Sequence, residues 1–397
     1  MPEIAEVARV VHFLRQHLVG KKVRMAIAQE DSSVFGKVGT TGPEVAAALM
    51  GKKVVSAGSQ GKYFWLVLEK PPHLVMHLGM TGWVHLRGIK SAYTNYYKKM
   101  KPGEEDQWPP KYAKLQLETE GPNKVEVAYT DPRRFGRIRL VDCPGDEIRK
   151  HTPLVENGPD PVVDADVFTR EYFAAKMTAR RVPIKALLLD QTVISGIGNW
   201  VGDEVLFQAR LHPERYSNEC SEAEVGRLYD AVRDVCRTAV DELGDSDEFP
   251  AHWLFNYRWG KGGKPSRLPD GEPLAFVTVG GRTSCFAPAL QKNKGALPRG
   301  AKVIKEESEE VEKKEEIKAK EQQGSDKDEE PPASKRRRVA KDAKAKPVAS
   351  KGSRQSSSKR PEKKEVKEEP GVEAAAEDSG KRRSGRLRGI ANGKPTN

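Results

Sequence analysis

Residues 182–200 read VPIKALLLDQTVISGIGNW, and this stretch marks a change from one type of structure to another. The apolar run over residues 182–189 has the spacing of a helix. It leads through Asp-Gln into Ser-Gly-Ile-Gly-Asn-Trp, which predicts a turn and the start of a further helix. Backbone N–H groups and the amide of Asn199 at a helix start could bind a phosphate, although a corner in any helical protein uses the same residues.

The chain after this stretch keeps the helical spacing. Apolar side chains recur every three or four positions from Val225 to Leu243, so we expect a helical domain over residues 165–245. Residues 252–290 have the pattern of short strands.

The chain before this stretch predicts a different architecture. It begins with an amphipathic helix over residues 4–18, with Glu3 and Glu6 in the first turn, where the helix dipole favours carboxylates. Short apolar or alternating runs follow between Gly- and Pro-rich turns, at residues 53–57, 63–68, 114–117, 125–129 and 138–141. These runs indicate a mostly antiparallel β domain, and a Pro-rich segment at 153–161 separates it from the helices.

The composition of the chain changes near residue 295. Residues 301–397 contain 27 Lys plus Arg, 20 Asp plus Glu and no aromatic residue, so they carry +7 of the net charge of +12. Such a segment cannot bury enough apolar surface to offset chain entropy, and we expect it to be disordered. Both parts are basic, which favours nucleic acid over a membrane, since no apolar run approaches the ~20 residues that span a bilayer.

The ends and the cysteines of the chain add two expectations. The start lacks the basic region and apolar run of a secretory signal, so we expect an intracellular protein. The four cysteines form no Cys-x-x-Cys pair, which predicts reduced thiols rather than a disulfide framework or a zinc ribbon.

Pro2 is the first candidate for chemistry. Initiator Met is usually removed before a small residue, and a terminal secondary amine, which titrates near ~8, can attack an electrophilic carbon. Attack on a sugar anomeric carbon would give an iminium ion, and the adjacent Glu3 could protonate or orient the sugar oxygen. On these residues alone the alternative is an ordinary first helical turn, where Pro is common.

Two further segments carry candidate DNA contacts. Lys62 enters a strand after a glycine and is either a solvated strand-end residue or a cation held for a phosphate, and residues 77–82 (HLGMTG) form the next turn. Residues 131–136 (DPRRFG) place two arginines and an aromatic ring on a tight loop. Such a loop is either a solvated turn or a wedge that fills the gap left by a flipped nucleotide.

In this order, Pro2-Glu3, Lys62, residues 77–82, 131–136 and 196–199 and Gly281-Arg282-Thr283 resemble the formamidopyrimidine-DNA glycosylase family. The resemblance covers roughly residues 2–292. It implies an α+β fold in which an N-terminal β-sandwich flanked by helices (2–150) precedes a helix-two-turn-helix domain (151–248). A finger β-hairpin (249–294) and the charged tail (295–397) complete the implied organisation, with damaged double-stranded DNA as the partner of a monomer.

The resemblance also implies roles for individual residues. Pro2 would form the Schiff base with the sugar of the lesion, Glu3 would assist ring opening and proton transfer, and Lys62 and Asn199 would hold phosphates. Glu6 matches a second motif acid, although Ile4 and Ala5 replace the Leu and Pro that the family has between the acids. The remaining implied DNA contacts are His77, the void-filling residues Met80, Arg133 and Phe135, a phosphate contact at Arg134, and Arg282 in the minor groove.

The finger departs from the usual family pattern. The four zinc-binding cysteines of the family align with Ser266, Pro269, Ala287 and Leu290, so no zinc is expected and the hairpin resembles the zincless finger of plant and fungal members. The stretch 249–260 leaves little room for a long base-capping loop. We therefore expect formamidopyrimidines and hydantoins to be better substrates than 8-oxoguanine, with base excision followed by β,δ-elimination.

The tail and the competing functions complete the expectations. Basic clusters at residues 332–339 and 381–383 suit nuclear import or loose DNA contact, although such a charge run can also be merely solvated. Nuclear import would not exclude a mitochondrial pool. The alternative to the enzyme is a noncatalytic damaged-DNA or chromatin-binding protein that kept the fold, but such a binder should have lost some of Pro2, Glu3, Lys62 and Asn199. A scaffold protein driven by the tail would leave the wedge residues unexplained.

Overall fold

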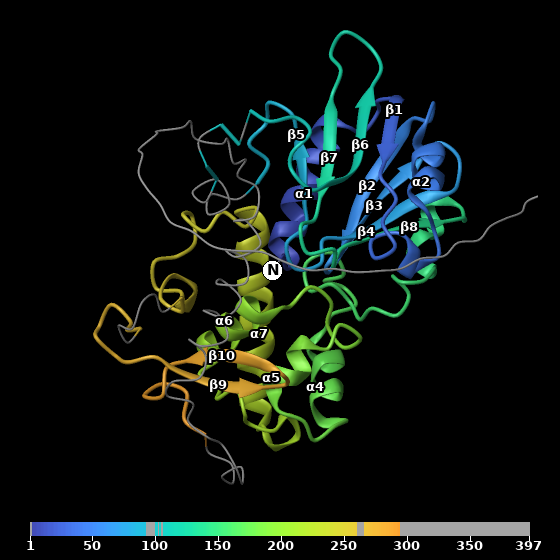
Figure 1. The fold of residues 1–397 in the computed structure, drawn as a ribbon. Helices are drawn as coiled ribbons and strands as arrows, with labels where there is room; N and C mark the ends of the chain where they lie inside the picture. The colour runs from blue at the N-terminus through green and yellow to red at the C-terminus, as the bar shows by residue number, and fades with distance from the viewer. Residues whose placement is uncertain (1, 93–99, 102, 105, 260–265, 294–397) are drawn as a thin grey trace, which may run out of the picture. The chain divides into compact units, whose positions relative to one another are not determined.

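The computed structural model describes residues 2–92, 100–101, 103–104, 106–259 and 266–293. The expected disorder of the charged tail therefore lies outside the described residues. Among these residues, two four-stranded sheets are followed by a helical region and a two-stranded hairpin, which confirms the expected α+β fold (Figure 1). No helix of the described part is long and apolar enough to cross a membrane.

The N-terminal region consists of two antiparallel sheets that enclose a core. The first sheet has the order β1-β6-β7-β5, formed by Val23–Ala28, Ala113–Thr119, Glu126–Thr130 and Trp83–Leu86. The second sheet has the order β2-β3-β4-β8, formed by Val54–Gln60, Tyr63–Leu68, His73–His77 and Arg137–Val141. The helices α1 (Ile4–His17) and α2 (Gly42–Leu49) complete this region.

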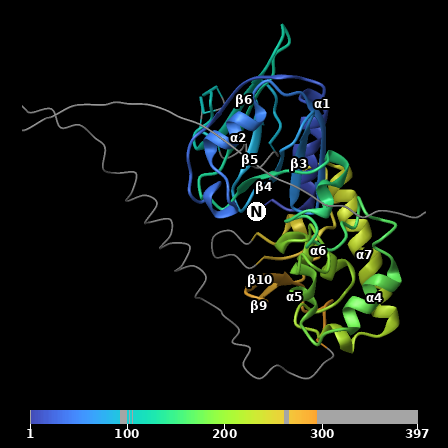
Figure 2. The same ribbon diagram turned by 90° about the vertical axis from the view of Figure 1, so that its right-hand side faces the viewer.

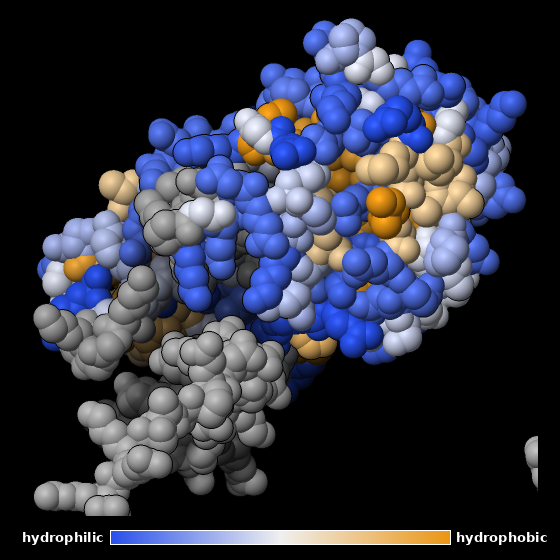
Figure 3. All heavy atoms as spheres, turned by 45° about the horizontal axis from the view of Figure 1, so that its top comes forward, coloured by the Kyte–Doolittle hydropathy of each residue, from blue (hydrophilic) through white to orange (hydrophobic). Residues whose placement is uncertain are grey.

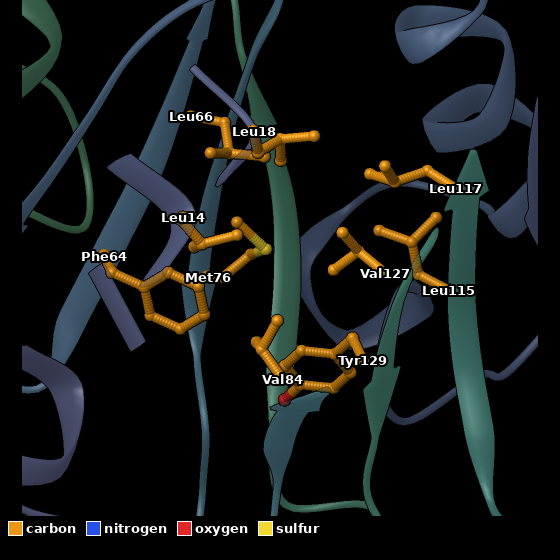
Figure 4. A pocket seen from close by; sticks show the side chains of 10 residues that line it. All are labelled: Leu14, Leu18, Phe64, Leu66, Met76, Val84, Leu115, Leu117, Val127 and Tyr129. Carbon is orange, nitrogen blue, oxygen red and sulfur yellow. The ribbon is translucent and has the colours of Figure 1, made fainter. Parts of the chain in front are cut away.

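Apolar side chains of both sheets and of α1 meet between the sheets (Figure 4). Leu14 and Leu18 lie against Phe64 and Met76 of the second sheet, and Leu117 is among the residues that face them from the first. The small cavity between them, about 20 Å³, is lined by apolar residues. Burial of these apolar side chains between the sheets stabilises the sandwich, although its strands are short.

Helices dominate after residue 168. They are α4 (Arg170–Thr178), α5 (Ile184–Leu189), α6 (Asn199–Gln208) and α7 (Glu222–Asp241). α5 begins two residues later than the apolar run, because Pro183 takes the N-cap position. Thr169 and Ser221 cap α4 and α7 by accepting backbone N–H groups, which satisfies donors that have no partner within the helix.

The helix α1 belongs to two cores. Ile4 and Ala5 pack in the core of the helical region, whereas the side chains from Val7 to Leu18 pack in the core of the β region. The beginning of α1 therefore lies where the sheets and the helices meet, as the two perpendicular views agree (Figures 1 and 2).

The hairpin formed by β9 (Ala275–Val279) and β10 (Arg282–Phe286) packs on α6. Its core contains Leu268, Leu274 and Cys285 together with Phe207 of α6. Hydrophilic residues predominate on the face shown in Figure 3, although apolar side chains gather in one region of it.

Candidate active site

Glu3 joins the first residues of the chain to the start of α6. Its Oε2 accepts the N–H groups of Gly198 (2.7 Å) and Val201 (3.0 Å), and its Oε1 accepts that of Trp200 (2.9 Å). The first N–H groups of a helix have no partner within it and carry partial positive charge, so a carboxylate is stabilised there. The sequence suggested that these backbone N–H groups bind a phosphate. In the structure they bind the carboxylate of Glu3.

Pro2 is buried beside this contact. The chain is fixed directly after it, because the Ile4 N–H donates to the Gly196 carbonyl (3.1 Å). Gly196 has φ +98°, and a Cβ atom there would lie 2.9 Å from the Cβ of Ile4, so a larger residue would push the two segments apart. Pro2 and Glu3 are thus held between the β region and the helices.

Lys62 lies on the two-residue turn between β2 and β3. Gln60 pairs with Tyr63, and Gly61 at the first turn position has φ +59°, as in a type II′ hairpin. The Gly61 N–H donates to Oδ2 of the buried Asp160 (2.8 Å), and a Cβ at Gly61 would lie 2.5 Å from the Cβ of Ser195. The tip of the hairpin is therefore held against the segment that precedes α6.

The charges around Lys62 come from distant parts of the sequence. Burial lowers the pKa of Lys62, while the carboxylates of Glu3 and Glu6 oppose this effect and the guanidinium of Arg282 adds to it. The structure thus brings the expected catalytic residues and the finger arginine into one electrostatic environment.

Glu6 is hydrogen-bonded to the backbone of Glu3, whose N–H donates to its Oε2 (2.9 Å). Burial and the adjacent Glu3 carboxylate raise the pKa of Glu6 to about 7. Glu6 can therefore carry a proton near neutral pH, next to Pro2 and Glu3.

His77 ends β4 close to Lys62. Burial, and then the positive charges of Lys62 and Arg137, lower the pKa of His77 to about 4. Its Nδ1 is 3.0 Å from the N–H of Gly79 and accepts that bond, so the neutral ring has its proton on Nε2. His77 is thus a neutral donor rather than a cation.

The three expected void-filling residues lie on two loops that pack closely. A Cβ at Gly79 would be 2.4 Å from the backbone nitrogen of Gly136, so the loop with Met80 directly contacts the loop with Arg133 and Phe135. The guanidinium of Arg133 lies over the ring of Phe135, 5.1 Å from its centroid. Phe135 is 48% exposed, which leaves a large apolar side chain facing solvent.

Arg134, between these two residues, is engaged within the protein. Its Nε and Nη2 donate to the buried Asp31, with Nε 2.9 Å from Oδ2. The expected phosphate contact at Arg134 stays a prediction. A phosphate would have to share the guanidinium with the Asp31 carboxylate.

Asn199 and Arg282 connect α6 to the hairpin. Asn199 is the first residue of α6 and donates its side-chain N–H to the carbonyl of Thr283 in β10 (2.9 Å). Arg282 begins β10 and its side chain is exposed. The structure therefore places the two residues on adjoining elements, and their roles as DNA contacts stay predictions.

A buried ion cluster anchors the hairpin. Asp203 of α6 accepts hydrogen bonds from Lys185 of α5, from Arg258 and from the backbone N–H of Cys285 in β10. Its side chain and that of Lys185 are fully buried. Burial lowers the pKa of Lys185, while the Asp203 carboxylate opposes that effect.

The four finger positions that align with zinc ligands show other interactions. Ala287 is fully buried in the hairpin core, and the Ser266 carbonyl accepts the N–H of Leu274 (2.8 Å). Pro269 is exposed and Leu290 is 37% exposed. Within the described residues, no three His, Cys, Asp or Glu side chains form a group that could hold a metal ion.

Two family models match the chain: the formamidopyrimidine-DNA glycosylase N-terminal domain over residues 1–138 and the H2TH domain of the same glycosylase over residues 157–249. A formamidopyrimidine-DNA glycosylase of Arabidopsis thaliana is 36% identical over 292 residues, which are 74% of this chain and 71% of that protein. The chain belongs to the formamidopyrimidine-DNA glycosylase family. It is a DNA-repair glycosylase, as the resemblance implied.

Further relatives agree with this assignment. The formamidopyrimidine-DNA glycosylase of Thermomicrobium roseum is 32% identical, covering 73% of this chain and 99% of the bacterial one. The Lactococcus lactis enzyme has been crystallised with DNA containing an AP site and with DNA containing FAPY-dG. Each structure is 26% identical with a TM-score of 0.59 and covers 73% of this chain and all of its own.

Sequence reasoning missed several charged residues that shape this glycosylase site. Asp31, Asp160 and Asp203 each accept hydrogen bonds that fix a loop or hairpin carrying an expected functional residue. They lie in unremarkable sequence, and only their long-range partners distinguish them from solvated acids.

Proposed function

We propose that this glycosylase is bifunctional, excising oxidised purines from duplex DNA and then cleaving the strand as an AP lyase. The observation that carries the proposal is the convergence of Pro2, Glu3, Lys62 and Arg282 from distant parts of the sequence. A degenerate binding protein would have no need to keep a nucleophile, an acid and a phosphate-binding cation together.

The amine of Pro2, free after removal of Met1, would attack C1′ of the damaged nucleotide. The C1′–N bond to the base breaks and the base leaves with the amine proton. The C1′–O4′ bond then breaks while O4′ takes a proton, and the resulting iminium ion joins Pro2 to the opened sugar. Loss of a proton from C2′ then permits elimination of the 3′ phosphate, and a further elimination releases the 5′ phosphate. The product is a one-nucleotide gap.

The hydrogen bonds of Glu3 suit a role in proton transfer. Oε2 accepts two N–H groups and Oε1 accepts one, and the capping box adds the backbone N–H of Glu6 as a further donor to this carboxylate. The helix start would hold the carboxylate in place while it transfers a proton to or from the sugar oxygen. Glu6, with its pKa raised to about 7 by burial and by Glu3, supplies a second proton site nearby.

Lys62, His77 and Asn199 would bind the DNA backbone around the lesion, with His77 donating from Nε2 as a neutral group, and Arg282 would reach the minor groove. Met80, Arg133 and Phe135 would fill the space vacated by the flipped nucleotide, a step that costs a few kcal/mol. The exposure of Phe135 and its contact with Arg133 support this assignment.

The finger would hold its shape without zinc, as in the zincless plant and fungal type. The buried cluster around Asp203 and the apolar core with Ala287 support this proposal, since both link β10 to α6.

We further propose formamidopyrimidines and hydantoins as preferred substrates, with 8-oxoguanine excised poorly. We also propose nuclear import through the basic clusters at residues 332–339 and 381–383.

The decisive experiment is borohydride trapping on duplex DNA containing a formamidopyrimidine, comparing the wild type with Pro2→Gly after mass spectrometry confirms Met removal. The hydride reduces the iminium ion to a stable amine, so the wild type should be trapped covalently and the variant should not. Tight binding by a correctly processed wild type without any adduct would favour the noncatalytic damaged-DNA or chromatin-binding alternative.

Substrate preference needs a separate measurement. Steady-state excision rates on matched duplexes with a formamidopyrimidine, a hydantoin or 8-oxoguanine should be lowest for 8-oxoguanine. A rate that favours 8-oxoguanine would contradict the proposed lesion range without affecting the proposed nucleophile.

A further inference from the structure

The loop that carries Arg133 and Phe135 joins the two sheets and is fixed from within by Asp131. This fully buried carboxylate accepts the N–H groups of Gly136 (2.6 Å) and Arg133 (3.2 Å) and the hydroxyl of Thr81 (2.8 Å). These bonds close the loop between β7 and β8 and join it to the turn with Met80. They do not reach the guanidinium of Arg134.

A second carboxylate, Asp31, lies outside this loop in the sequence and binds its residue Arg134. Its Oδ1 and Oδ2 accept hydrogen bonds from Nε and Nη2 of Arg134, and Lys114 of β6 lies 2.9 Å from Oδ2. Asp31 is only 6% exposed. Burial alone would raise its pKa, but the hydrogen bonds from Arg134 and Lys114 lower it well below the usual value.

Asp31 is itself rigidly placed. Its Oδ1 also accepts the backbone N–H groups of Ser33 (2.9 Å) and Val34 (3.1 Å). Val34 and Phe35 are fully buried in the sandwich core, and the Val34 carbonyl accepts the N–H of Ile138 at the start of β8. The carboxylate is therefore an anchor fixed to the core beside the loop.

The backbone of Arg134 explains why an anchor is needed. Its φ is +57°, in the left-handed region that a non-glycine residue adopts at a cost on the order of 1 kcal/mol. That conformation turns the guanidinium of Arg134 toward Asp31, and Arg134 stays exposed like Arg133 and Phe135 on either side of it.

We propose that Asp31 is a positioning residue for nucleotide extrusion, which presets the wedge loop by holding Arg134 in its left-handed conformation. This inference rests on the proposed function, because it concerns how the damaged nucleotide leaves the duplex. Asp31 touches no reacting atom and acts only through Arg134.

Two substrates separate extrusion from chemistry. One is a duplex with a formamidopyrimidine opposite cytosine, and the other is the same duplex with an AP site, whose sugar has no base to unstack. Single-turnover excision of the paired lesion by Asp31→Asn should fall about 10-fold, while its AP-site cleavage stays within about twofold of the wild type. Asp230→Asn, which removes an exposed partner of Arg170, is the charge-matched control and should leave both rates unchanged.

Two variants at position 134 test the role of the left-handed backbone. Arg134→Ala should lose paired-lesion excision as Asp31→Asn does. Arg134→Gly should retain more activity than Arg134→Ala, because glycine adopts φ +57° without an ion pair. If Arg134 instead bound a phosphate, the two variants would lose activity equally, and the slope of log affinity against log salt would fall by ~0.9 in both.

The remaining outcomes are equally decisive. Wild-type excision rates in Asp31→Asn would overturn the inference, and so would equal losses on both substrates, which would show a general structural role. If the wild type cleaved neither substrate, the proposed function would fail instead.

Discussion

Glu3 and Glu6 are three residues apart at the start of α1, yet their surroundings differ. Three backbone N–H groups of the α6 start bind the Glu3 carboxylate, whereas Glu6 faces that carboxylate and accepts the Glu3 N–H. Burial and this negative neighbour raise the pKa of Glu6 to about 7. The surroundings of Glu6, rather than its residue type, thus account for its raised pKa.

This difference predicts how stability depends on pH at Glu6. In the unfolded chain the pKa of Glu6 is near its ordinary value of 4.5, so between pH 4.5 and 7 only the folded protein keeps the proton. The contribution of Glu6 to stability is complete below pH 4.5 and is lost as the pH rises through 7. Glu6→Gln cannot ionise, so its stability relative to the wild type should increase over this range by up to about 3 kcal/mol.

Urea unfolding at pH 5 and pH 7.5 measures this change. Glu222→Gln, at the exposed start of α7, is the control and should keep a constant difference from the wild type. A constant difference for Glu6→Gln as well would refute the raised pKa.

At this scale the sequence predicted residues that stand in motifs and missed those defined by distant partners. Pro2, Glu3 and Lys62 were expected, and the structure places the carboxylate of Glu3 near Lys62. The roles of Asp31 and Asp160 could not be predicted, because each binds a partner about 100 positions away and such a distant pair forms no recognisable sequence motif. The sequence also gave no sign that the Glu3 carboxylate binds the N–H groups at the start of α6. The turn residues 196–199 would suit a phosphate and a carboxylate equally well.

Among the elements, the hairpin β9–β10 depends on α6. Asp203 links Lys185, Arg258 and the backbone of β10, so the hairpin is attached through one buried carboxylate as well as its apolar core. A buried ion pair adds little stability over an apolar replacement, but removing one member leaves uncompensated charge.

Asp203→Asn should therefore lower the free energy of unfolding by about 3 kcal/mol, because two buried cations lose their anion. Displacement of β10 should also weaken DNA binding through Arg282. Urea unfolding and fluorescence anisotropy on AP-site DNA measure the two effects, with the exposed Asp230→Asn as control. Wild-type stability in Asp203→Asn would mean that the apolar core alone holds the hairpin.

The hairpin β2–β3 makes a second prediction. Gly61→Ala places a Cβ 2.5 Å from the Cβ of Ser195 at a residue with φ +59°, so it should cost about 2 kcal/mol and move Lys62. Gly51→Ala is a matched control, since its φ is +71° but nothing lies within 4 Å of the added Cβ. Both variants should lose some stability, but only Gly61→Ala should lose AP-site cleavage. Equal cleavage by the two would show that the contact with Ser195 does not place Lys62.

For the whole molecule, periodicity predicted the two regions better than it predicted every element. The expected strand at 63–68 matches β3, and the helices from α4 to α7 lie within or beside the expected helical domain. The strands β1, β4 and β5 were not expected. β4 has only three apolar residues, which lie between two histidines, and β5 has four residues, so both show little alternation. The division of α1 between two cores also required the three-dimensional structure, since its apolar side chains form a single periodic pattern.

The charged tail leads to a prediction for the complete chain. Its residues 301–397 hold 27 of the 69 basic residues, and counterion release makes their contribution to DNA affinity depend on salt. A chain truncated after Asn293 should bind undamaged duplex more weakly at low salt and with a shallower slope of log affinity against log salt. Its single-turnover rate on saturating AP-site DNA should match that of the full chain, because every proposed site residue precedes the truncation. A slower rate at saturating DNA would show that the tail contributes to catalysis. An unchanged slope of log affinity against log salt would mean that the tail does not contact DNA.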